Sequence, residues 1–415
     1  MRGRKRQLFS AAGLILLVCC GGRESFGYGK TWMGQDLEQR IDAAALSLGP
    51  FRIRTLFDLS HAGYDTNVYR TPENPIGDFS IVGGPEFDVY LPLKKKAVIS
   101  ISESPQCVYF METERERTWN HFFSGRVNLI LNRVFIALGK GYSVAREIWN
   151  TEIDVRPKRK ENSSQALLLW QMTKKTSWSF TFSHADRDFE DLSYGEFGIK
   201  DQLNHSESRM NLAGYHQVSF RTRLFLNAEY ADFNFQSALN PRDSRSYAIF
   251  TGFEFSPAGV IRGRLSIGFK SFDILKPGNR DYRGIVGDAS ISVRVTKPLT
   301  LRTNYGRNVQ FSSWYDHAYY LENIIGGGAS LYVSARVRLD YNYAGGRNTY
   351  PAAAGDRPSS PERTDDYDSH QFGIYYRLKK NIGLGFIATR WKRDSTISWA
   401  NGKQGVFGMN LTYDF

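Results

Sequence analysis

Apolar and polar residues alternate with a period of two over long stretches of this chain, and this alternation limits the folds it can adopt. At the carboxyl end, Phe407, Met409, Leu411, Tyr413 and Phe415 occupy every second position, with polar residues or glycine between them. A period of two places the two sets on opposite faces of a β-strand, whereas a helix needs a period near 3.6. The chain is therefore predicted to consist mainly of strands with one apolar and one polar face.

The polar faces of several predicted strands carry arginine. Within residues 335–343, Arg336 and Arg338 alternate with alanine, valine and leucine, and residues 220–230 and 261–270 repeat this arrangement. Arginines do not suit the dry core of a β-sandwich, but they suit a wall with lipid on one side and water on the other. After residue 27 there is no run of 18 apolar residues, so a membrane-spanning helix is not expected. These features predict an all-β fold, a single transmembrane antiparallel up-and-down barrel.

Short and long breaks between the predicted strands alternate strictly, which supports this fold. Short breaks such as Lys297–Pro298 would be periplasmic turns, and the longer polar breaks would be extracellular loops, as in outer-membrane barrels. Eight short and nine long breaks predict 18 strands, with 16 as the alternative, and place both chain ends on the short-turn side. The predicted long loops are 66–77, 111–116, 150–162, 189–203, 236–244, 273–282, 312–318, 345–367 and 394–403.

Residues 1–27 have the pattern of a cleaved signal peptide. Basic residues precede a short apolar segment, Leu8–Val18, and small residues precede a cleavage position after Gly27. A lipoprotein signal ending at Cys20 fits less well and is the weaker alternative. With the leader removed, Cys107 is the only cysteine, so no intrachain disulfide is expected. We expect an exported protein of the cell outer membrane.

Residues 28–50 are predicted to form a periplasmic segment before the barrel, which would comprise residues 51–415. Leu37, Ile41 and Leu48 have helical spacing and predict a short helix over 35–48. This helix would lie at the periplasmic rim, or, as the less favoured alternative, inside the lumen.

Residues 49–70, GPFRIRTLFDLSHAGYDTNVYR, resemble the start of the putative β-barrel porin 2 family of bacterial outer-membrane proteins, whose first strand carries a GYDxNvyr segment. The resemblance covers about the first 45 residues of the barrel and elsewhere concerns the strand rhythm. It implies contact with outer-membrane lipid and lipopolysaccharide. The final strand also resembles the signal that such proteins present to the barrel-assembly machinery, which would comprise Phe407, Met409, Leu411, Tyr413 and Phe415.

No motif in the chain points to catalysis, and we predict that it is not an enzyme. The seven histidines are scattered, without metal-ligand spacing, and Asp365, Asp366 and Asp368 lack the spacing of a calcium loop. No cofactor, metal or nucleic acid is predicted. A basic run, residues 156–160, would be an exposed outer loop; binding of lipopolysaccharide phosphates is the less favoured reading.

Arginines near the predicted tight turns are the main candidates for function. Facing water, they would form a basic ring at the periplasmic mouth that favours anionic solutes. Alternatively, they would pair with Glu229, Glu254, Asp288 and Asp340 in a ladder that stiffens the wall. The ring would comprise Arg221, Arg223, Arg262, Arg264, Arg302, Arg336, Arg338 and Arg377.

The predicted function is a porin-like channel for diffusion of small polar, and by preference anionic, solutes. Barrels of this size are wide enough for an aqueous channel. Two alternatives remain open from the sequence. One is an export conduit for a surface polysaccharide that works with periplasmic partners, and the other is a structural barrel with a closed lumen.

Overall fold

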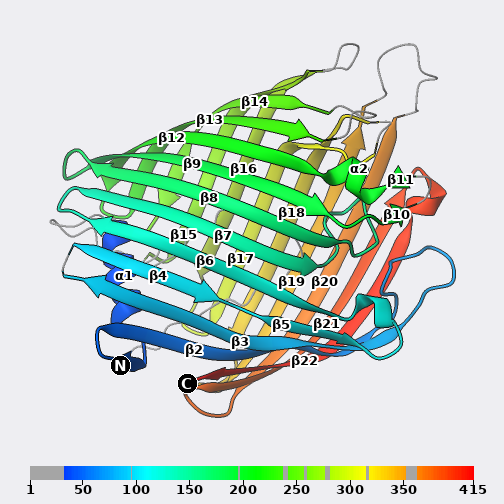
Figure 1. Cartoon of the computed structure of the whole chain (residues 1–415), viewed down its shortest axis with the longest axis horizontal. Helices are drawn as coiled ribbons and strands as arrows, with labels where there is room; N and C mark the ends of the chain where they lie inside the picture. Colours follow the sequence, from blue (N-terminus) through cyan, green and yellow to red (C-terminus); the bar gives the residue numbers. More distant parts are fainter. Residues whose placement is uncertain are drawn as a thin grey trace.

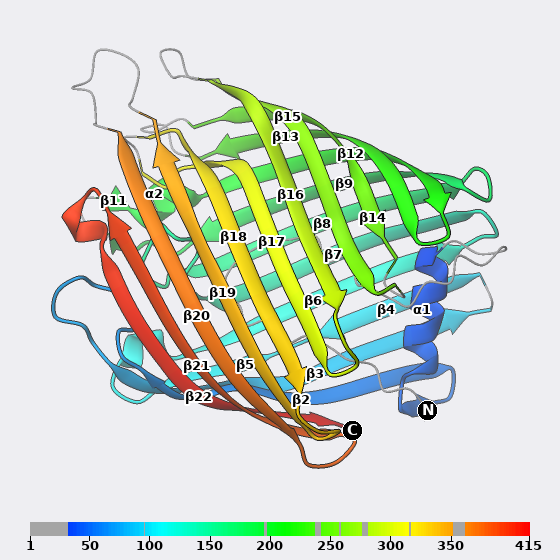
Figure 2. The same ribbon diagram turned by 180° about the vertical axis from the view of Figure 1, so that it is seen from behind.

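One antiparallel sheet closes on itself to form the wall of a barrel (Figures 1 and 2). The structure is a computed structural model, and it describes residues 32–94, 96–194, 197–236, 242–256, 259–275, 281–314, 317–351 and 362–415. The predicted leader lies outside these residues. No helix in the described part of the chain has the length and apolar character needed to cross a membrane.

The elements follow one another along the chain with few helices between them. They are α1 Trp32–Asp42, β1 Leu46–Leu48, β2 Phe51–Asp65, β3 Asp78–Leu93, β4 Ala97–Glu103, β5 Gln106–Phe110, η1 Glu114–Glu116, β6 Thr118–Ile130, β7 Val134–Arg146, β8 Lys158–Gln171, β9 Thr176–Phe189, β10 Ser193–Tyr194, β11 Phe197–Gly198, α2 Ile199–Leu203, β12 His205–Ser219, β13 Thr222–Phe235, β14 Ser244–Phe255, β15 Ile261–Ile274, β16 Tyr282–Arg294, β17 Leu299–Phe311, β18 Tyr319–Tyr332, β19 Val337–Tyr350, β20 Arg363–Arg377, β21 Ile382–Ser395, η2 Ser398–Ala400 and β22 Gly402–Asp414.

The wall has 18 strands, which confirms the prediction. Of the twenty segments in the main sheet, β1 is a three-residue extension paired with β2, and β4 and β5 are halves of one wall strand. Both halves pair with β3 on one side and β6 on the other. The break between them contains Pro105, which has no N–H to donate to a ladder.

The barrel closes because its first long strand pairs with its last. β2 pairs with β22 from Leu56↔Asp414 to Asp65↔Val406, with an irregularity between Leu59 and Ala62. Lipid cannot satisfy an open sheet edge, so this pairing supplies the hydrogen bonds that both edges need.

Exposed apolar side chains identify the outer face of the wall. Ile249, Phe269 and Ile285 are direct cross-strand neighbours and are 61%, 56% and 60% exposed. Neighbours of this kind share one face of a sheet, and large exposed apolar residues belong on the lipid side of a barrel. The alternate residues, among them Ala248 and Lys270, are buried and face the interior.

The two rims differ as predicted, with short turns at one end and long loops at the other (Figure 1). Two loop predictions were too long: β8 already begins at Lys158, and the predicted loop 345–367 shrinks to the residues between Tyr350 and Arg363. The basic run at 156–160 is therefore mostly strand, and its Arg159 is buried between Glu147 and Glu161. The expectation of an exposed basic loop was wrong because the strands continue beyond the apolar belt, where both faces are polar.

Helix α1 lies inside the barrel at the short-turn end, between the two walls seen from opposite sides in Figures 1 and 2. Its Met33, Leu37 and Ile41 pack on an apolar patch of the inner wall. The patch comprises Tyr90, Val98, Ile130, Phe135, Ala137 and Leu169. The helix therefore starts and ends earlier than the predicted 35–48, and it lies against the lumen wall, which was the less favoured placement.

Candidate functional site

The candidate site is the barrel interior, where the predicted arginines have different surroundings. Arg223 and Arg264 both pair with Glu254, at 2.7 and 3.5 Å. Their guanidinium groups also lie over inner-wall rings, Arg223 over Tyr215 at 5.2 Å and Arg264 over Phe225 at 4.0 Å. A carboxylate at the edge and a ring at the face hold each guanidinium in place.

A second inner-wall arginine, Arg338 on β19, is held in the same way, four strands from Arg264 on β15. Arg338 pairs with Asp340 at 2.9 Å and lies 4.3 Å from the centre of the Tyr375 ring. Arg302 on β17, two strands from β19, donates hydrogen bonds to the Ser330 hydroxyl at 2.7 Å and the Asn342 side-chain oxygen at 3.0 Å. Both acceptors of Arg302 are neutral, so its positive charge is not balanced by them.

The other four predicted arginines lie at the turns. Arg262 and Arg377 donate to the backbone carbonyls of Gly259 and Ala335. Arg221 and Arg336 lie within the turns themselves, where their backbone N–H groups donate to serine hydroxyls. Among the described residues, Arg262, Arg302 and Arg377 have no carboxylate oxygen within 4.0 Å.

A ladder of ion pairs that the sequence pattern did not predict lies on the inner faces of β8, β9, β12 and β13. Glu161 accepts from Arg187 at 2.9 Å, Arg187 donates to Glu207 at 2.8 Å, and Arg209 joins Glu207 to Glu229, the last at 2.9 Å. Inward-facing residues of adjacent strands alternate between acidic and basic. This pattern becomes visible in the sequence once the strand register is known. The ladder is a wall-stiffening arrangement of the kind predicted above, and it contains one of the predicted carboxylates, Glu229, paired with an arginine that was not predicted.

The loop between β7 and β8, residues 147–157, crosses the loop-side end of the interior. Its Glu152 is fully buried and accepts hydrogen bonds from the Ser312 hydroxyl and the Ser313 backbone N–H, both at 2.7 Å. Asn150 donates to the Ser313 hydroxyl at 2.7 Å. These serines follow β17, which stands close to the opposite side of the ring of strands from β7.

Further contacts fix the crossing loop to the wall. The guanidinium of Arg393 on β21 donates to the Thr151 carbonyl and pairs with Asp154, and Asn348 donates to the Thr151 hydroxyl at 3.0 Å. On its other side, Ile153 packs in an apolar cluster with Phe189, Ile199 and Leu203. The crossing loop is thus held from several directions and narrows this end of the barrel.

Burial dominates the electrostatics of the crossing loop. Burial raises the pKa of Glu152 above its ordinary value, although the serine hydrogen bonds and the charge of Arg363 act in the opposite direction. Burial lowers the pKa of Arg242, in the loop before β14, to about 10, against the attraction of Glu152. Arg242 stays charged at neutral pH, and it donates to the carbonyls of Gln202 and Ser312.

The segment that resembles the porin family connects the first long strand, β2, to the last strand, β22. Asp65 accepts from the Asn67 backbone N–H at 2.9 Å and from Gln404 on β22 at 2.7 Å. Asn67 donates to the carbonyl of Lys403 at 2.9 Å, and Arg70 donates to Gln404 at 2.8 Å. The side chains of Asp65, Asn67 and Arg70 therefore contact the last strand.

Four of the predicted assembly-signal residues lie on the outer face of β22, and Phe415 follows directly after the strand. Phe407, Met409 and Phe415 are exposed, and Leu411 and Tyr413 are partly buried. Cys107 is free. Within the described part of the chain, no group of three or more histidine, cysteine, aspartate or glutamate residues could hold a metal ion.

Comparison with known proteins gives a family and a fold. The Putative beta-barrel porin 2 family matches residues 40–415. No curated protein sequence matches the chain.

Three solved structures are similar with a TM-score of 0.50 each. The outer membrane protein opdK from Pseudomonas aeruginosa has 8% identity over 88% of this chain and 98% of that chain. Pseudomonas aeruginosa OccK2 (OpdF) has 8% identity over 88% and 97%. The siderophore receptor PirA from Acinetobacter baumannii has 9% identity over 89% and 81%. At these identities, the similarity establishes the barrel fold and nothing finer.

Proposed function

Because the chain belongs to the Putative beta-barrel porin 2 family, we propose that this outer-membrane barrel is a channel for small polar solutes and that it prefers anions. The observation that carries the preference is the set of inner-wall arginines near the short-turn end. Arg302 has only neutral acceptors, and Arg262 binds only a backbone carbonyl among the described residues. Positive charge on a water-facing wall lowers the energy of an anion there.

The two ends of the barrel would restrict passage in different ways. At the loop side, the crossing loop would set the narrowest point, because Glu152 and Arg393 tie it to distant strands. At the short-turn side, α1 packs on the inner face of the strands from β3 to β8. Solutes would therefore pass between the helix and the arginines of β13 to β20.

Single-channel conductance of the refolded chain in planar bilayers tests this proposal. Under a KCl gradient, the reversal potential should show anion preference, and Arg302→Gln should reduce that preference. Arg302→Lys is the matched control, because it keeps a positive charge at the same inner-wall position. A folded barrel that conducts nothing, or one with cation preference, would contradict the proposal.

A closed structural barrel is the second candidate, and the buried loop contacts favour it. Asp154, Glu152 and Arg393 are all buried, as in a packed interior. The same conductance measurement separates the two, since a closed barrel would fold without conducting. An export conduit has less support, because α1 packs on the inner wall and does not project toward a periplasmic partner.

A further inference from the structure

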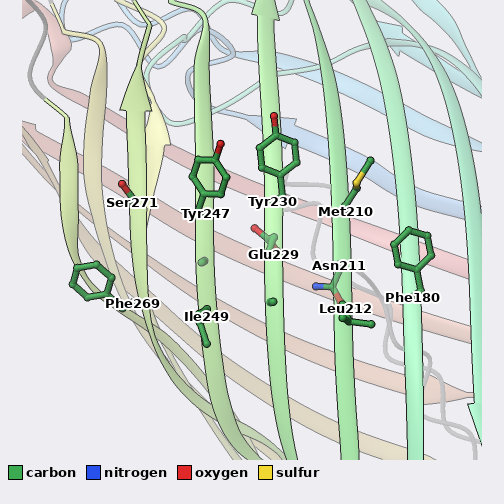
Figure 3. A pocket seen from close by; sticks show the side chains of 12 residues that line it. Phe180, Met210, Asn211, Leu212, Glu229, Tyr230, Tyr247, Ile249, Phe269 and Ser271 are labelled. Atoms are coloured by element: carbon green, nitrogen blue, oxygen red, sulfur yellow. The ribbon is translucent and has the colours of Figure 1, made fainter.

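A groove of about 510 Å³ runs along the outside of the wall over β9, β12, β13, β14 and β15 (Figure 3). Its cause is one small residue in a row of large ones. Leu212, Ala228 and Ile249 are direct cross-strand neighbours, and Phe180 and Phe269 continue the row on either side. Ala228 leaves a notch between Leu212 and Ile249.

The groove itself is almost wholly apolar, and polar side chains adjoin it at one end. Phe180, Leu212, Ile249 and Phe269 line the part that lies within the apolar belt. Toward the long loops, the next row consists of Met210, Tyr230, Tyr247 and Ser271. In Figure 3 the hydroxyl groups of Tyr230 and Tyr247 point the same way, away from Leu212 and Ile249. This gradient matches an amphiphile that lies along the strands.

Two outward arginines stand at the polar end, and the first of them, Arg245, has Asp232 and Asp273 as its direct cross-strand neighbours. Arg245 on β14 is 50% exposed at its side chain, and its Nε donates to Asp232 at 3.2 Å. In the described part of the chain its two Nη nitrogens have no acceptor. Arg283 on β16 is exposed and is the cross-strand neighbour of Ser271. Guanidinium groups with unused donors are suited to bind phosphate oxygens.

We propose that this groove is a binding site for lipid A, with one acyl chain in the notch at Ala228 and a phosphate near Arg245 and Arg283. The long loops of outer-membrane barrels are extracellular, so the polar end of the groove lies in the outer leaflet. Within the belt only acyl chains or another protein can cover an apolar surface. The arginines and tyrosine hydroxyls at one end favour a phosphorylated lipid over a second barrel.

Native mass spectrometry of the chain refolded in a neutral detergent tests the site, with purified lipid A, dephosphorylated lipid A and dipalmitoyl phosphatidylglycerol as probes. Ala228→Phe fills the notch and should weaken lipid A binding about tenfold. Ala388→Phe is the matched control, because Ala388 is paired with Phe407 and Phe372 on the same outer face but far from the groove. It should bind lipid A like the unchanged chain.

The headgroup is tested by a double variant, Arg245→Gln with Arg283→Gln, against Arg347→Gln, an exposed arginine on β19. The double variant should bind lipid A about tenfold more weakly and should no longer distinguish it from the dephosphorylated form. Unchanged binding in Ala228→Phe, equal binding of phosphatidylglycerol, or a dimer in place of a lipid complex would overturn the proposal. These readouts do not depend on conductance, so they are independent of the proposed channel function.

Discussion

Arg393 on β21 and Asp154 in the crossing loop form a buried ion pair although 239 residues separate them in the chain. The same guanidinium donates to the carbonyls of Thr151 and Ala400. One side chain therefore fixes the crossing loop to the far part of the wall. We expect this attachment to keep the crossing loop in place across the loop-side end of the interior.

Arg393→Gln should release the crossing loop. Removing one partner of a buried ion pair typically costs about 3–5 kcal/mol, because the other charge stays buried and unpaired. We expect a lower free energy of unfolding in urea and a larger single-channel conductance. Arg347→Gln is the control: its pair with Asp366 is 61% and 49% exposed, so the loss should stay below about 1 kcal/mol. Equal effects of the two substitutions would count against the role of Arg393.

The attachment of the crossing loop should depend on pH through Glu152. The fold raises the pKa of this carboxyl above 4.5, so the folded state binds its proton more tightly than the unfolded state does. The contact of Glu152 with the serines is therefore most stable below pH 4.5. It loses stability as the pH rises from 4.5 through the raised pKa that Glu152 has in the folded state. The nearby Arg242, with a pKa of about 10, stays charged throughout this range.

Hydrogen exchange of residues 147–157 measures this dependence. Protection should increase as the pH falls, after correction for the intrinsic exchange rate. Glu152→Gln should remove the dependence, whereas Glu114→Gln, at a loop side chain that is 76% exposed, should keep it. A pH dependence that survives in Glu152→Gln would assign it to another group.

Gly63→Ala should impair closure of the barrel. A Cβ at this position would lie 1.9 Å from the carbonyl oxygen of Phe407 and 2.4 Å from the Cα of Gly408. Both are backbone atoms of the strand that β2 must pair with, so neither can turn aside. Gly125→Ala is the control, because a Cβ there meets nothing within 4 Å. The folded fraction after refolding, read from the electrophoretic mobility of unheated samples, should fall for Gly63→Ala alone.

Leu37→Asp should detach α1 from the inner wall. Leu37 packs with Met33 and Ile41 on the apolar patch, and a carboxylate in that contact would lose its hydration without gaining a partner. The helix should then leave the short-turn mouth and conductance should rise. Asp42→Asn, at an exposed position of the same helix, should leave conductance unchanged. A Leu37→Asp channel with unchanged conductance would show that α1 does not restrict passage.

The sequence predicted the strands well where they cross the lipid belt, because lipid and water impose opposite polarity on alternate residues. It failed where the strands project beyond the belt. Lys158, Arg159 and Lys160 begin β8, yet all three are basic, so no period of two can be seen there. The boundaries of the longest loops were missed for this reason.

The helix and the crossing loop show two further limits. The spacing of Leu37 and Ile41 predicted a helix, but Leu46–Leu48 pair with the start of β2 and end it early. Its position could have been inferred from Phe135 and Leu169, which are apolar residues on a face that is otherwise polar. The contact of Glu152 with Ser312 joins residues 160 positions apart, and no local pattern encodes it.

The contacts of Asp65 and Asn67 with the last strand can form only in a chain that has been synthesised to its end. Their partners Gln404 and Lys403 belong to the last strand to be synthesised. A chain that stops short of these residues loses one of the two hydrogen bonds to the Asp65 carboxylate and one of the two that the Asn67 amide donates. An incomplete chain therefore lacks the side-chain contacts that hold the first long strand of the barrel to the last.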